Sequence, residues 1–98
     1  MNRRMLRHWV LVNDRPQDLH VGDPVHVAAA QLGVGPNAQH IVEFWAEGTL
    51  DDLDLPERTF QVFGTGQPLP HNAVWIGTTD RTSEGLVWHL YELLVGLA

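Results

Sequence analysis

The chain of 98 residues has the length of one small domain, and its hydrophobic content of 44% argues against a disordered acidic chain. The formal net charge of −6 argues against the basic surface that nucleic-acid-binding proteins need, so no nucleic-acid partner is expected. The sequence contains no cysteine, which excludes disulfide bonds, cysteine-ligated zinc and a thiol nucleophile.

The first residues, MNRRMLRHWVLV, imitate the charged start of a signal peptide. Arg7 and His8 interrupt the apolar run, however, and no small-residue cleavage site follows. No stretch approaches the ~20 apolar residues of a membrane span, so no membrane partner is expected. We therefore expect a soluble, cytoplasmic protein with a single small β domain over residues 1–98, of which residues 1–4 are flexible.

Turn-forming clusters rich in Gly, Pro, Asn and Asp divide the chain into short runs of Val, Trp, Phe, Ile and Thr. Short strands between regularly spaced turn signals are typical of an all-β sandwich or barrel. In chain order, the expected strands cover residues 5–12, 17–21, 25–31, 40–47, 58–64, 73–78 and 86–94. The sequence therefore predicts an all-β fold, a small antiparallel barrel or sandwich of six or seven short strands.

Two segments permit a helical interpretation. The three alanines of PVHVAAAQLG fit a helical turn, although Val25 and Val27 favour a strand. In GLVWHLYELLVGLA the leucines recur at helical spacing, whereas Val, Trp and Tyr dominate the start of the segment. We expect strands in both places.

The segment GTGQPLP, residues 64–70, raises the question of a phosphate-binding loop. The dinucleotide fingerprint requires a third glycine where Leu69 stands, and Pro68 and Pro70 lack the N–H groups that would hold a phosphate. A second strand follows in place of a helix. We expect a glycine bulge at the end of strand 58–64, then an extended crossover to strand 73–78, with Gly64 or Gly66 at positive φ.

The pattern HVGDPVH contains the only histidine spacing that suggests a metal site. A three-residue loop would place His20 and His26 opposite each other on a hairpin, with Asp23 or another histidine as a third zinc ligand. The pattern lacks the established zinc motifs, so these two residues are weak candidates. No cofactor is expected.

Catalytic patterns are also absent from the sequence. Ser83 has no G-x-S-x-G elbow around it. Six acidic residues lie between Glu43 and Glu57, but a flexible loop does not fix two carboxyl groups at the separation that acid–base catalysis requires. This acidic segment is expected to be a solvated loop or, alternatively, a docking surface for a basic partner. We expect no enzyme.

The aromatic residues are the strongest candidates for a binding surface. Strand alternation places Trp45 and Phe63 on the faces opposite the expected core residues. An exposed aromatic patch on a small domain indicates a partner or self-association. We expect binding through Trp45, Phe63 and Trp75, with His89 at the rim; the open alternative is that these aromatics fill a two-sided core.

Several motifs, RTFQVFGTGQPLP, WIGT, LVWHLYEL, VHVAAAQ and FWAEG, resemble those of a family of short uncharacterised proteins. The family is common in actinobacteriophages and in phage-derived bacterial genes, and the likeness covers residues 6–93. Members commonly carry histidine where Gln67 stands here.

The resemblance implies a compact all-β domain and a phage accessory role in the cytoplasm of the infected host cell. We expect a non-enzymatic binding module that acts through a host protein partner or self-association as a homo-oligomer. Two alternatives are a sponge for a nucleotide-like small molecule and a minor structural component of a virion.

Overall fold

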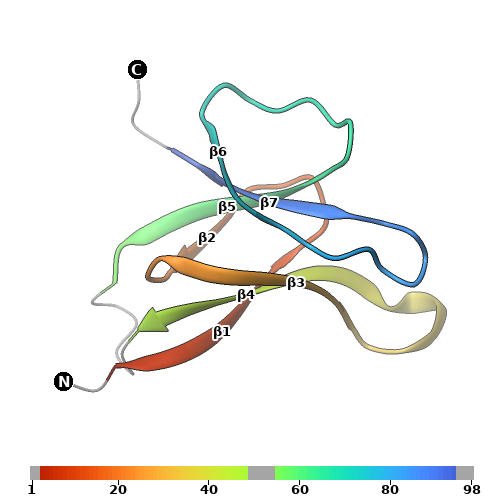
Figure 1. Cartoon of the computed structure of the whole chain (residues 1–98), viewed down its shortest axis with the longest axis horizontal. Helices are drawn as coiled ribbons and strands as arrows, with labels where there is room; N and C mark the ends of the chain where they lie inside the picture. Colours follow the sequence, from red (N-terminus) through yellow and green to blue (C-terminus); the bar gives the residue numbers. More distant parts are fainter. Residues whose placement is uncertain (1–2, 49–54, 95–98) are drawn as a thin grey trace.

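Two antiparallel β-sheets face each other in the computed structural model, which describes residues 3–48 and 55–94 (Figure 1). The strands are β1 (Arg4–Leu11), β2 (Gln17–His20), β3 (Pro24–Leu32), β4 (Gln39–Gly48), β5 (Glu57–Gly64), β6 (Ala73–Thr78) and β7 (Trp88–Leu93), with one 3₁₀ turn, η1 (Gly35–Asn37). The three-stranded sheet has the order β1-β4-β3 and the four-stranded sheet the order β2-β5-β7-β6. The sheets do not close into a barrel, so the all-β prediction is confirmed as an open sandwich.

All seven expected strands are present, and both ambiguous segments are strands. The C-terminal segment forms β7 because β5 pairs with it on one side and β6 on the other. Of residues 1–4, which were expected to be flexible, Met1 and Asn2 lie outside the described residues. β1 begins at Arg4, and Arg3 donates a hydrogen bond of 2.7 Å from Nε to Glu47 Oε1. Residues 3–48 and 55–94 contain no helix that could span a membrane.

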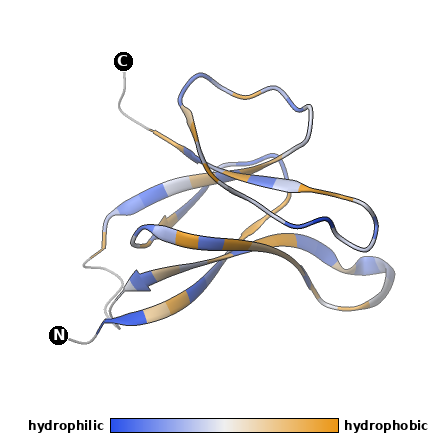
Figure 2. Ribbon diagram, viewed as in Figure 1, coloured by the Kyte–Doolittle hydropathy of each residue, from blue (hydrophilic) through white to orange (hydrophobic). Residues whose placement is uncertain are grey.

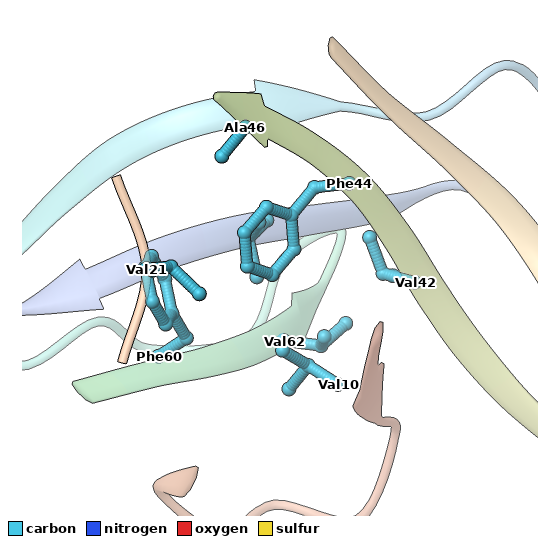
Figure 3. Packing of buried hydrophobic residues seen from close by; sticks show 8 residues of the cluster. Val10, Val21, Val42, Phe44, Ala46, Phe60 and Val62 are labelled. Atoms are coloured by element: carbon cyan, nitrogen blue, oxygen red, sulfur yellow. The ribbon is translucent and has the colours of Figure 1, made fainter. Parts of the chain in front are cut away.

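The core lies between the sheets and is built by strand alternation (Figures 2 and 3). Phe44 on β4 and Phe60 on β5 meet at the centre, with ring centroids 5.1 Å apart. The fully buried side chains around them come from both sheets and, for Val21, from the connection between β2 and β3: Val10, Val21, Val42, Ala46, Val62 and Leu90. Each sheet therefore covers the apolar face of the other.

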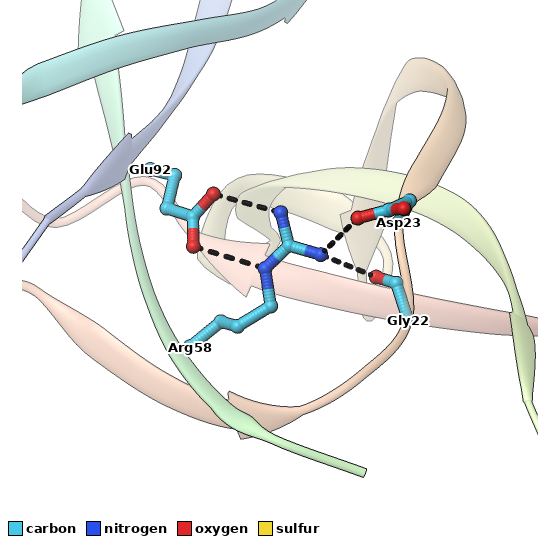
Figure 4. A network of polar contacts seen from close by, with 4 residues as sticks. All are labelled: Gly22, Asp23, Arg58 and Glu92. Atoms are coloured by element: carbon cyan, nitrogen blue, oxygen red, sulfur yellow. Dashed lines mark hydrogen bonds and ion pairs between the residues drawn. The ribbon is translucent and has the colours of Figure 1, made fainter.

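An arginine-centred cluster fastens the β2–β3 corner to the four-stranded sheet (Figure 4). Arg58 Nε and Nη2 donate to the two carboxylate oxygens of Glu92 at 2.9 and 2.7 Å. Arg58 Nη1 donates to the Gly22 carbonyl at 3.0 Å and to Asp23 Oδ1 at 2.8 Å. The hydrogen bonds to Glu92 contribute most, followed by the contact with Asp23, and together they raise the pKa of Arg58 above its ordinary value. Partial burial acts in the opposite direction but is outweighed.

The segment GTGQPLP begins with a β-turn. Gln67 N–H donates to the Gly64 carbonyl at 3.1 Å, and Gly66 has the positive φ of 87° that this turn requires. The expected bulge at the end of β5 is therefore wrong; the irregular positions lie in β3 between Pro24 and His26 and in β6 after Trp75. The expected crossover is confirmed, because β7 lies between β5 and β6 in the sheet.

Candidate functional site

The four predicted binding residues lie on two different faces of the sandwich. Phe63 is the cross-strand partner of His89, and Trp75 is that of Tyr91, so these residues share the outer face of the four-stranded sheet. Trp45 lies on the outer face of the other sheet. The structure therefore brings three of the four together and separates Trp45 from them.

Phe63 does not belong to an exposed patch, because it is only 3% exposed. Its ring meets the Tyr91 ring edge-on, with centroids 5.5 Å apart. The connection from Thr65 to Asn72 arches on the side of the four-stranded sheet that faces away from the three-stranded sheet (Figure 1). For Phe63, the alternative of a core on both sides of its strand is correct.

Hydroxyl groups connect Trp75 to His89. The Trp75 indole Nε1–H donates to Thr78 Oγ1 at 2.9 Å. The same hydroxyl shares a hydrogen bond of 2.9 Å with His89 Nδ1, and His89 Nε2 shares one of 2.8 Å with Thr65 Oγ1. Either neutral tautomer of His89 satisfies both hydroxyls, because one ring nitrogen donates and the other accepts. This row of hydrogen bonds holds the indole in one orientation while 57% of Trp75 stays exposed.

A groove runs along the free edge of β3. One part, of about 310 Å³, is lined by residues that include Val25, Trp75 and Gly77. The other part, of about 460 Å³, is lined by β3 from His26 to Gln31 and by residues 80–84. Both parts share His26, Val27 and Asp80, so they form one continuous edge groove.

The walls of the edge groove come together at Gly77. A β-carbon at position 77 would lie 2.7 Å from Val27 Cγ2, so only glycine lets β6 approach β3 this closely without displacing Val27. At the far end, Glu84 Oε1 lies 3.6 Å from His40 Nε2 and 3.5 Å from Gln31 Nε2. The approach of Gly77 to Val27 therefore lies where the two parts of the groove meet, and the contacts of Glu84 lie at the far end of the larger part.

Trp45 contacts a residue of the edge groove from the outer face of the three-stranded sheet. Its ring contacts the His26 ring with centroids 5.5 Å apart, and His26 lines both parts of the groove. On the other side, Arg7 is the cross-strand partner of Trp45 and forms an ion pair of 3.2 Å with Glu43. Trp45 is half-buried in this setting.

The predicted pairing of His20 with His26 is wrong. β2 pairs with β5 whereas β3 pairs with β4, so the two histidines lie in different sheets and not on one hairpin. The loop between them turns the chain from one sheet to the other. His20 Nδ1 instead lies 3.0 Å from the Leu55 carbonyl oxygen. Among residues 3–48 and 55–94, no group of three or more His, Cys, Asp or Glu side chains is placed to hold a metal ion.

The other candidate positions of the sequence are dispersed. Ser83 lies on the wall of the edge groove, and Trp88 packs against the core. Asp51, Asp52 and Asp54 of the acidic segment lie outside the described residues.

Sequence reasoning missed Thr65, Thr78 and the free edge of β3. Threonine is common in strands and turns, so its frequency carries no signal. The short side chains of the alanine run at 28–30 fit a strand edge that another backbone can approach. Alternation alone, however, does not tell which strand lies at the edge of a sheet.

No curated protein and no solved structure matches this chain. A family model does match, over residues 1–95, and its description is a domain of unknown function, DUF7352. The expected membership of an uncharacterised family is thereby confirmed, and the chain, a two-sheet sandwich with a groove along its open edge, belongs to the DUF7352 family.

Proposed function

We propose that the protein is a non-catalytic binding module that holds a protein partner on the surface around Trp75. The observation that carries this proposal is an exposed indole whose orientation is fixed by the Thr78 hydroxyl. Tryptophan is among the residues most enriched at the energetic centres of interfaces. A side chain that is already held in place loses little further entropy when it binds.

The surroundings of Trp75 suit a partner with apolar side chains. Val25, which is 62% exposed, lines the same part of the edge groove as Trp75. Together these side chains offer an apolar surface next to a groove, which is typical of a site for another protein.

We propose in addition that the partner is a host protein and that the module acts as a phage accessory protein inside the infected cell. The support for this step is the motif likeness over residues 6–93. Self-association through the same surface is the alternative, and it predicts a homo-oligomer without any host protein.

The test compares Trp75→Ala with Trp9→Ala as a matched control. Trp9 is 42% exposed but lies on the outer face of the three-stranded sheet. A partner is first captured from host lysate, then purified, and its affinity for each variant is measured by calorimetry. Loss of a central interface tryptophan costs about 2–4 kcal/mol, which corresponds to about a 30- to 1000-fold weaker Kd.

Trp9→Ala should leave the affinity unchanged, and both variants should melt within a few degrees of the wild type. Equal loss in both variants, or no loss in Trp75→Ala, would contradict the proposal. Unfolding of Trp75→Ala would assign Trp75 to the core; Trp75→Phe, which keeps most of the apolar surface but not the indole N–H, then separates the two roles.

The size of the edge groove favours a second candidate, a sponge for a nucleotide-like molecule. Its larger part of about 460 Å³ falls within the range of about 300–1000 Å³ that is usual for small-ligand sites. A ligand that binds only the native state raises the melting temperature. A thermal-shift screen against nucleotides therefore tests this alternative directly.

A further inference from the structure

We infer that the partner enters the edge groove as an extended segment and pairs with β3 as an added strand. This inference rests on the proposed function, because it specifies how a protein partner is held. Within the described part of the chain, β3 pairs only with β4, so the opposite edge of β3 has no strand beside it. An unpaired edge is a ready template for an extended peptide.

The register shows which backbone groups of β3 are free. Val12 N–H donates to the His40 carbonyl, so the backbone groups of His40 point toward β1. Successive residues of a central antiparallel strand point alternately to its two neighbours, and hence Ile41 and Glu43 point toward β3. Their partners on β3 are Ala30 and Ala28.

It follows that the N–H and C=O groups of Val27, Ala29 and Gln31 point away from β4. All three residues line the larger part of the edge groove. Residues 28–30 are all alanine, and their short side chains allow another backbone to approach this edge. The free hydrogen-bonding groups therefore face the space in which a ligand would lie.

The shape of the groove favours a slender segment over a second copy of the protein. The free edge of β3 lies inside the groove, where residues 80–84 form the opposite wall. Two copies paired β3 to β3 would each have to insert this recessed edge into the groove of the other. A single extended peptide meets no such obstacle.

Charge favours a basic partner, because Asp80 and Glu84 line the groove together with Arg81 and give this lining a net negative charge. Asp80 lies where the two parts of the groove meet, and none of the described residues forms an ion pair or side-chain hydrogen bond with it. The whole chain has a net charge of −6. A Lys or Arg side chain on the added strand would pair with Asp80, while an apolar side chain would rest on Trp75 and Val25.

The test uses peptides selected on the wild-type protein from a displayed library of random twelve-residue sequences. Ala29→Pro removes one N–H that faces the groove but leaves the ladder to β4 intact, a position at which an edge strand tolerates proline. Its control is Ala28→Pro, which removes a ladder hydrogen bond to β4 and should lower the melting temperature. Peptide affinity is measured by fluorescence polarisation, and backbone amides are followed by NMR.

Three results are expected. Ala29→Pro weakens peptide binding about tenfold or more, as the loss of a backbone hydrogen bond and the presence of a ring at the edge require. The peptide protects the amides of Val27, Ala29 and Gln31 from hydrogen exchange. Asp80→Lys weakens the selected peptides, and these are rich in Lys and Arg.

If Ala29→Pro does not fold, the same test is made on the peptide: methylation of alternate backbone nitrogens must abolish binding to the wild type. Peptides that bind Ala29→Pro and the methylated form undiminished would overturn the inference, and so would a library that yields no binder. A wild-type dimer that Ala29→Pro dissociates would assign the edge to a second copy instead. Loss of partner binding in Trp75→Ala alone, without effect of Ala29→Pro, would leave the proposed function standing and refute only the added strand.

Discussion

Replacing Arg58 by methionine should remove a large part of the free energy of unfolding of this small domain. The variant keeps a side chain of similar length but leaves the Glu92 carboxylate and the Gly22 carbonyl without their donor. Glu92 has few other options, because both side chains are largely buried, with Arg58 17% and Glu92 15% exposed.

The magnitude follows from that geometry. Removal of one member of a fully buried ion pair costs about 3–5 kcal/mol. Since water still reaches both groups and Asp23 is almost fully exposed, we take the lower end, about 3 kcal/mol. Each kcal/mol lowers the Tm of a domain of this size by about 4–8 °C, so a fall of about 12–24 °C is expected.

Urea denaturation of four proteins measures this effect: the wild type, Arg58→Met, Arg58→Lys and the double variant Arg58→Met/Glu92→Leu. Lysine keeps the charge but cannot make the two-pronged contact with Glu92, so Arg58→Lys should fall between the wild type and Arg58→Met. The double variant also removes the Glu92 carboxylate, which Arg58→Met leaves unpaired, and should therefore be more stable than Arg58→Met. A loss below about 1 kcal/mol in Arg58→Met, or a double variant no more stable than the single one, would refute the reasoning.

Two further substitutions and one pH series test other contacts. Thr78→Val removes the acceptor of the Trp75 indole at a cost of about 1 kcal/mol, and the indole N–H resonance in NMR should shift and exchange faster; an unchanged resonance would speak against the hydrogen bond. Gly77→Ala should destabilise by about 1–3 kcal/mol in urea denaturation through the clash with Val27, and the added change Val27→Ala should restore part of the loss; a stable single variant would show that the sheets do not approach so closely. The pKa of Arg58 is raised on folding, so its stabilisation is fully present below its ordinary pKa and is lost only as the pH rises through the raised value. The stability difference between wild type and Arg58→Met should therefore stay constant from about pH 6 to about pH 9, and a fall within that range would contradict a stabilisation that depends on the charged guanidinium.

The strands could be predicted from the sequence because they depend on local chemistry. Gly, Pro, Asn and Asp end the runs, and β-branched and aromatic residues fill them, so even the ambiguous C-terminal segment was assigned correctly to β7. The all-β class follows from the spacing of those runs. Both inferences need only residues that are close together in the sequence.

The candidate site could be predicted only in part, because it depends on which strands become neighbours. Phe63 alternates out of the core-facing row of its strand, but it is only 3% exposed on the other face, where its ring meets the ring of Tyr91. The error on His20 and His26 has the same origin: a three-residue loop permits a hairpin, and the chain instead passes to the other sheet. The free edge of β3 is a property of strand order, which no local pattern encodes.

The order in which the chain visits the two sheets also has a consequence for folding. The chain changes sheets three times, after β1, after β2 and after β4, so each sheet combines one early strand with strands that follow only after a visit to the other sheet. During synthesis, the three-stranded sheet would have all its strands once Gly48 is made, yet its apolar face stays uncovered until β5 and β7 follow. Long-range pairing of this kind slows folding, and uncovered strands are prone to associate with others. The last strand to be synthesised is thus an inner strand of its sheet, and the sandwich acquires its protected interior only near the end of synthesis.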